Sequence, residues 1–310
     1  MMKKKAMQLP FAWIFASLIG AFILFLAIYI AVKLINTGEE EIDLKTGAEI
    51  GILINPLETG FQDSQTNFIV LPVETRIYNE CSETGTFGEQ RIKITQWSFN
   101  KWTDTKTKVS FQNKYIFSRN YSEGEKFYLF SKPLEMPFKI ADLVYLASSK
   151  EKYCFVDAPI PIKEELDSLG QENIFTNDSS IDCPENSITV CFFGNSCDIN
   201  IDYSSNKVVR KRGDSLYFEG DALMYAAIFS DKALYECQLK RLTKRAEQLS
   251  ALYRDKAALI SREDCNSNLN LAALSSTLNS LENSRGPFVN LKNIVDEIKQ
   301  NNELADCKLW

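Results

Sequence analysis

A long uncharged hydrophobic run, Ala6 to Val32, constrains this chain more than any other feature of its sequence. At about 1.5 Å of rise per helical residue, the run is longer than the roughly 30 Å hydrocarbon core of a bilayer. It therefore predicts one membrane-spanning helix over residues 9–35. A cleaved secretory signal is the alternative, although the hydrophobic region of such a signal is normally only about 7–15 residues long.

The charges beside this run predict its direction. Lys3, Lys4 and Lys5 precede it, and no acidic residue occurs before Glu39. By the positive-inside rule, residues 1–8 form a basic cytoplasmic tail of a single-pass protein in the cell membrane, whose bulk is extracytoplasmic. Beyond residue 38 the chain has 31 basic and 41 acidic residues, a surplus of acid that disfavours nucleic acid as a partner.

A short basic stretch that ends in a small residue, Lys3-Lys4-Lys5-Ala6, is followed by Met7-Gln8-Leu9-Pro10 and the hydrophobic run. This arrangement resembles an archaeal type IV pilin-like leader and membrane helix. The resemblance implies processing between Ala6 and Met7, after which the helix anchors the protein or packs into a filament. It covers the N-terminal 35 residues, lacks the acidic residue that bacterial pilins carry near the start of the mature helix, and does not extend to the exterior region. An ordinary signal anchor with basic flanking residues is the alternative.

Small residues repeat within the predicted membrane helix. Ala16, Gly20, Ala27 and Ala31 lie on roughly one helical face, which would let a second helix approach closely. We therefore expect the lipid bilayer as one partner, and a protein partner or a second copy of the chain as another, bound through the membrane helix or the exterior domain.

All eight cysteines lie beyond the hydrophobic run, and none belongs to a C-x-x-C pair. An even number of cysteines in an exported region predicts disulfides, whereas a reduced buried set is the alternative. Proximity in sequence nominates Cys237 with Cys265 or Cys307, and pairs within the cluster from Cys183 to Cys197. The candidates are Cys81, Cys154, Cys183, Cys191, Cys197, Cys237, Cys265 and Cys307.

The hydrophobic pattern predicts an α+β fold. Residues 36–66 are polar and acidic at their start and form a stalk and entry segment. Residues 67–219 contain short runs rich in Val, Ile, Thr, Phe and Tyr, which predict a sheet-rich mixed domain with one strand-helix-strand unit near residues 153–175. From residue 220 to residue 310 apolar residues recur every three or four positions in three segments, which predicts a C-terminal three-helix bundle.

The chain contains no histidine, which excludes Ser-His-Asp and Cys-His catalysis and histidine-ligated zinc. Two S-x-x-K patterns, Ser98 to Lys101 and Ser204 to Lys207, lack the other motifs of serine-lysine enzymes, and the K-T-G at Lys45 precedes them in the wrong order. We therefore predict no catalytic residues and no cofactor.

Asp198, Asn200 and Asp202 alternate as in the start of a calcium loop. Tyr203 then stands where such a loop needs glycine, and the pattern is better explained by a half-buried strand with a polar outer face. Other carboxylates, Asp142, Asp157, Glu164 and Glu165, surround the strand-helix-strand unit, where the last two would interact favourably with the helix N-terminus.

Together these patterns predict a single-pass, membrane-anchored extracytoplasmic protein with a structural or interaction role, such as a pilin-like or envelope assembly component. A membrane-tethered hydrolase or carbohydrate-active enzyme that uses carboxylates alone, and a ligand-binding surface receptor, are the alternatives.

Overall fold

The computed structural model describes residues 13–33, 65–98, 100–103, 108–194, 196–211, 213–263, 269–283 and 288–310. Its fold is mixed α+β, as the sequence predicts, and the structure divides the strands between two sheets. The predicted cytoplasmic tail, the stalk, the Ala6–Met7 processing site and Cys265 lie outside the described residues.

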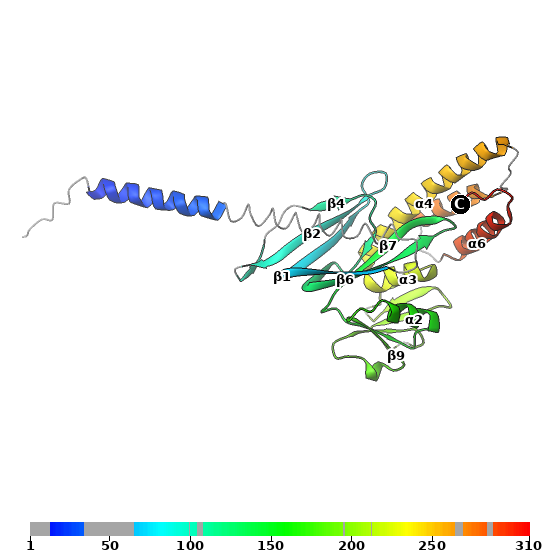
Figure 1. Cartoon of the computed structure of the whole chain (residues 1–310), viewed down its shortest axis with the longest axis horizontal. Coiled ribbons are helices and arrows are strands. Elements are labelled where there is room, and N and C mark those ends of the chain that lie inside the picture. Colours follow the sequence, from blue (N-terminus) through cyan, green and yellow to red (C-terminus); the bar gives the residue numbers. More distant parts are fainter. Residues whose placement is uncertain are drawn as a thin grey trace, which may run out of the picture.

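The N-terminal helix, Trp13–Lys33, stands apart from the folded part of the chain (Figure 1). None of its most hydrophobic stretch is buried by protein, and it is long and apolar enough to cross a bilayer. Ala16, Gly20, Ala27 and Ala31 are all exposed, and a Cβ atom added at Gly20 would meet no neighbouring atom. Its use as a packing face stays a prediction.

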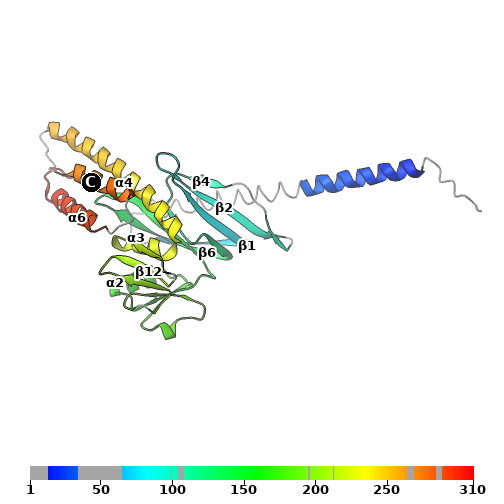
Figure 2. The same cartoon turned by 180° about the vertical axis from the view of Figure 1, so that it is seen from behind.

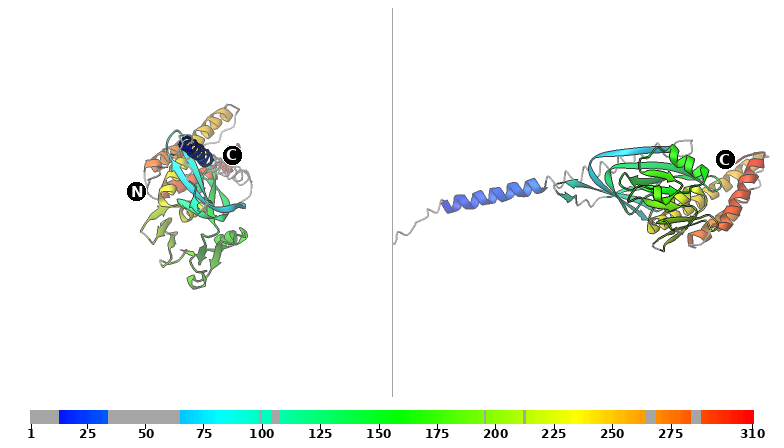
Figure 3. Two further views of the ribbon diagram at one scale, coloured as in Figure 1. Left: turned by 90° about the vertical axis from the view of Figure 1, so that its left-hand side faces the viewer. Right: turned by 90° about the horizontal axis from the view of Figure 1, so that it is seen from below.

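The first sheet has the strand order β3-β2-β1-β6-β7-β5, with β4 paired to β2. All its pairs are antiparallel except β5 with β7. The first strand curves strongly (Figure 3), and its pairing with β6 shifts between Val70 and Thr75. The strands are β1 Gln65–Ser82, β2 Glu89–Ser98, β3 Lys101–Trp102, β4 Val109–Phe111, β5 Ile116–Phe117, β6 Tyr121–Glu135 and β7 Lys139–Ser148.

The second sheet has the order β13-β12-β11-β10-β8-β9, in which the four strands from β11 to β9 run parallel. The predicted strand-helix-strand unit is confirmed, because α2, Ile160–Ser168, connects β8 to its parallel neighbour β9. Pro159 precedes this helix, and Gly170 follows it with a φ of 61° that suits glycine. The strands are β8 Tyr153–Val156, β9 Ile174–Asn177, β10 Ile188–Cys191, β11 Ile199–Asp202, β12 Lys207–Arg210 and β13 Ser215–Tyr217.

A short helix that the sequence analysis missed, α3, Gly220–Phe229, lies between the two sheets (Figures 1 and 2). It packs against β6, β7 and β12, and every residue from Ala222 to Phe229 is buried. A helix that is apolar on all sides has no amphipathic period, so its sequence gives no helical signal of the kind that surface helices give.

Three further helices follow: α4 Lys232–Ile260, α5 Leu271–Asn283 and α6 Val289–Leu304. They match the three predicted segments, and α5 packs against both α4 and α6. However, α4 also packs against β1 and β7, and one hydrophobic core joins Tyr145 and Phe155 of the sheets to Leu242 and Leu278 of the helices. A separate three-helix bundle is therefore not confirmed, because these helices complete the core of the sheets.

Arg241 attaches α4 to the first sheet, although it is only 1% exposed. Its guanidinium donates hydrogen bonds to the carbonyl oxygens of Phe87 (3.0 Å), Lys114 (3.0 Å) and Gln112 (2.8 Å). Burial lowers the pKa of Arg241, and the nearby Tyr115 and Glu89 oppose that effect. The approach is close: a Cβ atom on Gly88, whose φ is 59°, would lie 2.4 Å from a backbone oxygen and 3.0 Å from the Arg241 side chain.

A chain of buried amides continues from this arginine into the sheet. Arg241 donates to Gln238 Oε1 (2.7 Å), and Gln238 in turn donates to Gln90 Oε1 (2.7 Å). Gln90 also accepts from the backbone of Ile116 (2.7 Å) and donates to Asn79. Because each amide satisfies the next, these polar groups remain buried without the cost of unmade hydrogen bonds.

Three disulfides lie in the described part of the chain: Cys81–Cys237, Cys154–Cys183 and Cys191–Cys197. Cys307 is also disulfide-bonded. The prediction that Cys237 pairs with Cys265 or Cys307 is wrong, because the start of α4 lies on β1 and brings Cys237 to Cys81, 156 residues away. The prediction within the Cys183 to Cys197 cluster is correct for Cys191 with Cys197, whereas Cys183 bonds to Cys154.

We expect Arg241→Met to lower the free energy of unfolding by at least about 2 kcal/mol, because two buried acceptors, the Lys114 carbonyl and Gln238 Oε1, lose their donor and each unmet group costs about 1–3 kcal/mol. Chemical denaturation measures the change. Lys240→Met is the matched control, since Lys240 forms only a surface ion pair with Glu83 (3.0 Å) that is worth about 0–1 kcal/mol. Equal losses in the two variants would contradict the role assigned to Arg241.

Candidate functional site

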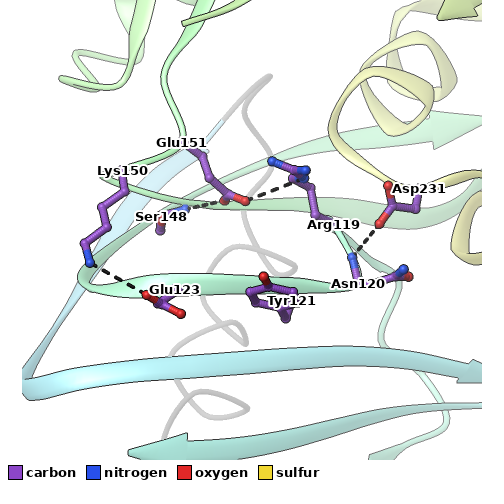
Figure 4. Close-up of a pocket in the computed structure, with 8 residues that line it drawn as sticks. All are labelled: Arg119, Asn120, Tyr121, Glu123, Ser148, Lys150, Glu151 and Asp231. Carbon is purple, nitrogen blue, oxygen red and sulfur yellow. Dashed lines mark hydrogen bonds and ion pairs between the residues drawn. The ribbon is translucent and has the colours of Figure 1, made fainter. Parts of the chain in front are cut away.

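A cleft of about 380 Å³ lies where the start of β6, the β7–β8 turn and the α3–α4 junction meet (Figure 4). This volume is within the range of about 300–1,000 Å³ that is usual for ligand pockets. No aliphatic side chain lines the cleft, which disfavours an apolar ligand. The lining residues are Arg119, Asn120, Tyr121, Glu123, Ser148, Lys150, Glu151 and Asp231.

Glu151 is the most buried carboxylate of the cleft, with a side chain that is 12% exposed. The tight turn after β7 places it, because the Glu151 amide donates to the Ser148 carbonyl (3.0 Å) and the Ser148 amide donates back to Glu151 Oε2 (2.8 Å). Ser122 donates to the same oxygen (2.9 Å), and Arg119 lies 4.0 Å from the other. Burial raises the pKa of Glu151, against the opposing effect of these hydrogen bonds and of Arg119.

Asp231 is the carboxylate of the α3–α4 junction. It precedes the first residue of α4 but does not cap the helix with its side chain. Instead its Oδ2 accepts from the backbone amide of Asn120 (2.7 Å), and its Oδ1 lies 3.7 Å from Arg210. Asp231 therefore connects the helical junction to the loop that leads into β6 and to β12.

Arg210 forms the base of this junction by donating to the carbonyls of Ala227 (2.8 Å) and Ser230. Burial lowers the pKa of Arg210, and Asp231 opposes that effect. A second hollow of about 250 Å³ adjoins the cleft, shares Arg119 and Asp231 with it, and is also lined by Arg210 and Asp198. The two hollows lie on either side of the Arg119 and Asp231 side chains.

Two buried polar atoms beside these hollows have no hydrogen-bond partner among the described residues: Ser148 Oγ in the cleft and Arg210 Nε in the adjoining hollow. Ser148 is completely buried. Buried polar groups are almost always hydrogen-bonded, because an unmet donor or acceptor costs free energy. Both atoms are buried, so they border the hollows without being exposed in them.

The outer part of the cleft is more exposed. Tyr121 is 49% exposed, and its ring centre lies 5.7 Å from that of Tyr78 on β1. Lys150 pairs with Glu74 and lies 3.9 Å from Glu123, which itself pairs with Arg76. The cleft thus combines a partly exposed aromatic ring with charged groups that already have partners of opposite charge.

The balance of charge limits what this cleft can bind. Two cations, Arg119 and Lys150, face three carboxylates, so the lining offers no surplus of positive charge to a phosphate or another polyanion. Within the described residues no group of three His, Cys, Asp or Glu side chains is placed to hold a metal ion. The remaining capacity is for hydrogen bonds and for contact with one aromatic face.

The three residues of the calcium-like pattern each have hydrogen-bond partners near them in the sequence. Asp198 accepts from the amide (3.1 Å) and hydroxyl (2.9 Å) of Thr189 on β10, and Asn200 bonds to both backbone groups of Cys197. The hydroxyls of Ser204 and Ser205 lower the pKa of Asp202 to about 2. Asn200 and Asp202 do lie in a strand, β11, and Asp198 directly precedes it, but the expected polar outer face is wrong at Asn200, which is buried.

The four carboxylates around the strand-helix-strand unit do not form the cleft. Asp142 pairs with Lys139 (2.8 Å), and burial raises the pKa of Asp142. Glu165 pairs with Lys132 (2.6 Å) and accepts from the Tyr225 hydroxyl (2.9 Å). The expected role at the helix N-terminus is wrong, because α2 begins at Ile160 and its first turn contains no acidic residue.

The sequence analysis singled out none of the cleft residues. They come from three segments separated by up to 112 positions, from Arg119 to Asp231, and none belongs to a catalytic motif. The sequence offered one indirect signal. The segment from Ser148 to Glu151, between two predicted strands, contains serine, lysine and glutamate, which are common in exposed turns; burial of this turn is what makes its carboxylate a candidate site residue.

The scan against protein-family models, the search of curated proteins and the search of solved structures each found no match to this chain.

The raised pKa of Glu151 gives a prediction for the dependence of stability on pH. In the folded protein the Glu151 carboxyl keeps its proton to a higher pH than in the unfolded chain, where its pKa is about 4.5. The stabilising contribution of the bound proton is therefore fully present below about pH 4.5 and is lost as the pH rises through the pKa of the folded state. Relative to Glu151→Gln, the free energy of unfolding of the unmodified protein should therefore fall as pH rises from about 4 to neutrality.

Denaturant unfolding at a series of pH values measures this difference. Glu125→Gln, on an exposed position of β6, is the control, and its curve should run parallel to that of the unmodified protein. The opposite outcome is that the free energy of unfolding of the unmodified protein rises with pH relative to that of Glu151→Gln. It would show that the fold stabilises the charged carboxylate of Glu151, and it would contradict a pKa raised by burial.

Proposed function

We propose that this chain is a single-pass membrane protein whose extracytoplasmic part binds a neutral, hydroxyl-rich ligand, such as a saccharide, in the cleft around Glu151. This is the ligand-binding alternative of the sequence analysis, given a specific site. The observation that carries it is a ligand-sized cleft whose lining is polar and includes the half-exposed ring of Tyr121.

The lining supports this class of ligand for two reasons. Its charged groups are held by one another or by neighbours, as in Arg76 with Glu123 and Arg210 with Asp231, so little uncompensated charge remains. Carboxylates, amides and hydroxyls hydrogen-bond well to the hydroxyl groups of sugars. The exposed ring of Tyr121 offers a surface on which the C–H face of a sugar ring can stack.

The export and anchoring parts of the proposal are supported by other features. The N-terminal helix is apolar over its length and leaves its surface for lipid, and lysines precede it in the sequence. Disulfides persist mainly in oxidising compartments outside the cytoplasm, and the described cysteines are all bonded. A pilin-like or envelope assembly role, and self-association through the membrane helix, stay predictions.

Mass spectrometry of the native protein from a washed membrane fraction tests the anchoring. We expect an N-terminus at Met1 or Met7, and a non-reduced peptide map that contains Cys81–Cys237, Cys154–Cys183 and Cys191–Cys197. A start at Met7 supports pilin-like processing, and a start at Met1 excludes it. A start near Thr37 would contradict the anchor, and eight free thiols would contradict export.

Thermal unfolding in the presence of saccharides tests the ligand. The probes are glucose, N-acetylglucosamine, maltose and cellobiose, with ATP and leucine as charged comparisons. A bound saccharide at about 100 times its Kd should stabilise the protein by about 2.7 kcal/mol, whereas ATP and leucine should not. Tyr121→Ala should abolish this shift, and Tyr203→Ala, which removes a partly exposed tyrosine of the second sheet, should preserve it.

The result contradicts the proposal if no saccharide shifts the transition, or if Tyr121→Ala and Tyr203→Ala respond alike. One observation favours a second candidate, a carboxylate-dependent glycoside hydrolase: burial raises the pKa of Glu151, which lines the same open cleft as Asp231, and a carboxyl group with a raised pKa can act as a general acid. Consumption of a bound saccharide, lost in Glu151→Gln without loss of binding, would establish that function instead.

A further inference from the structure

One hairpin of the first sheet differs from the rest of the exterior in its charge and in its aromatic content. Residues 91–114 contain six basic residues and one acidic residue, whereas the other residues beyond position 38 contain 25 basic and 40 acidic. Four aromatic residues share the segment: Trp97, Phe99, Trp102 and Phe111. A basic, aromatic segment in an otherwise acidic chain indicates a surface with a partner of its own.

The hairpin consists of the end of β2 and the short strand β3. Trp97 pairs with Trp102, Ser98 pairs with Lys101, and Asn100 makes the turn with a φ of 59°. The two indole rings meet edge to face with their centres 5.3 Å apart. Phe99 lies outside the described residues.

The rest of the sheet fixes this aromatic pair in place. The guanidinium of Arg76 on β1 lies 3.9 Å from the centre of the Trp102 ring, and Arg76 is held in turn by Glu123. Trp97 nevertheless stays 41% exposed, and Lys101 and Asn100 beside it are exposed. The hairpin lies at one end of the first sheet and projects beyond the neighbouring strands (Figures 1 and 3). A large indole surface is therefore held rigidly in solvent beside basic side chains.

We infer that this hairpin docks on the anionic lipid surface of the membrane that holds the N-terminal helix. Tryptophan is enriched at the membrane–water interface, where its ring contacts the acyl boundary and its N–H remains hydrated. Basic residues close to an anionic bilayer each strengthen binding about fivefold. The exposed ring of Trp97 and the exposed side chain of Lys101 beside it supply both kinds of contact at one place.

The membrane is the occupant that the charges of this chain favour. The exterior as a whole has a surplus of acid that an anionic surface repels, so this basic end of the domain approaches such a surface at a lower electrostatic cost than an acidic face would. The N-terminal helix keeps the hairpin near the bilayer, which turns docking into an intramolecular step and permits it with few contacts. Docking would fix the orientation of the domain on the bilayer. The inference rests on the proposed membrane anchoring and does not rest on the proposed ligand of the cleft.

The experiment uses the full chain in nanodiscs. Trp13→Phe removes the tryptophan of the membrane helix, so that Trp97, Trp102 and Trp310 provide the emission. We expect nanodiscs made with bromine-labelled acyl chains to quench part of this emission, and to quench more when the lipids are anionic than when they are zwitterionic. Lys101→Glu in this background should lower the ratio of docked to undocked domain by at least about fivefold, and Trp97→Ser should remove most of the quenching.

Lys211→Glu, which reverses an exposed charge on the second sheet, is the matched control and should leave the quenching unchanged. Incorporation into nanodiscs reports the anchor by itself, so failure of anchoring and failure of docking are distinguishable. The inference is wrong if the chain enters nanodiscs but brominated lipids do not quench it, or if Lys211→Glu lowers the quenching as much as Lys101→Glu. An acidic protein partner that binds the hairpin while the lipids leave it unquenched would also overturn it.

Discussion

The buried guanidinium of Arg241 is the interaction on which the packing of the C-terminal helices on the first sheet depends. It lies between α4 and the loops of that sheet, where it donates to three backbone carbonyls, of which that of Lys114 is buried. A charged group is costly to bury, and several directed hydrogen bonds are needed to offset that cost. The arrangement therefore fixes one position of α4 on the sheet, and the Cys81–Cys237 bond constrains the same position covalently.

The placement of α4 determines where its neighbours pack. Since α3 ends two residues before Asp231, fixing the start of α4 also fixes the end of α3 between the two sheets. There α3 contributes eight consecutive buried residues to a core shared by the first sheet, the second sheet and the C-terminal helices. Two tyrosine hydroxyls of this core bond to backbone carbonyls: Tyr145 donates to that of Ala222 (2.7 Å), and Tyr235 to that of Tyr217 (2.6 Å).

The cleft and the hairpin are consequences of this architecture at two different places. The cleft forms because the α3–α4 junction is brought against the β7–β8 turn and the start of β6, and Glu151 is buried there by the same packing that raises its pKa. The hairpin lies outside that junction and presents rings and lysines to its surroundings. The proposed ligand site is set by tertiary packing, whereas the proposed lipid-facing surface is set by local sequence. The two are connected through the Arg76–Glu123 pair.

Much of the secondary structure could be predicted from the sequence, because alternating and three-to-four-residue apolar periods identify strands and amphipathic helices directly. The helices at residues 232–260, 271–283 and 289–304 and the strand-helix-strand unit were found in this way. By itself the sequence also determined the apolar N-terminal helix, the absence of histidine chemistry and the tendency to form disulfides. Only the tertiary structure decided that α3 is a helix, that Cys237 bonds to Cys81, and that Glu151, Ser148 and Asp231 share a cleft. The physical reason is that periodicity reports which face of a segment is buried, whereas contacts between distant segments depend on how those faces pack against one another.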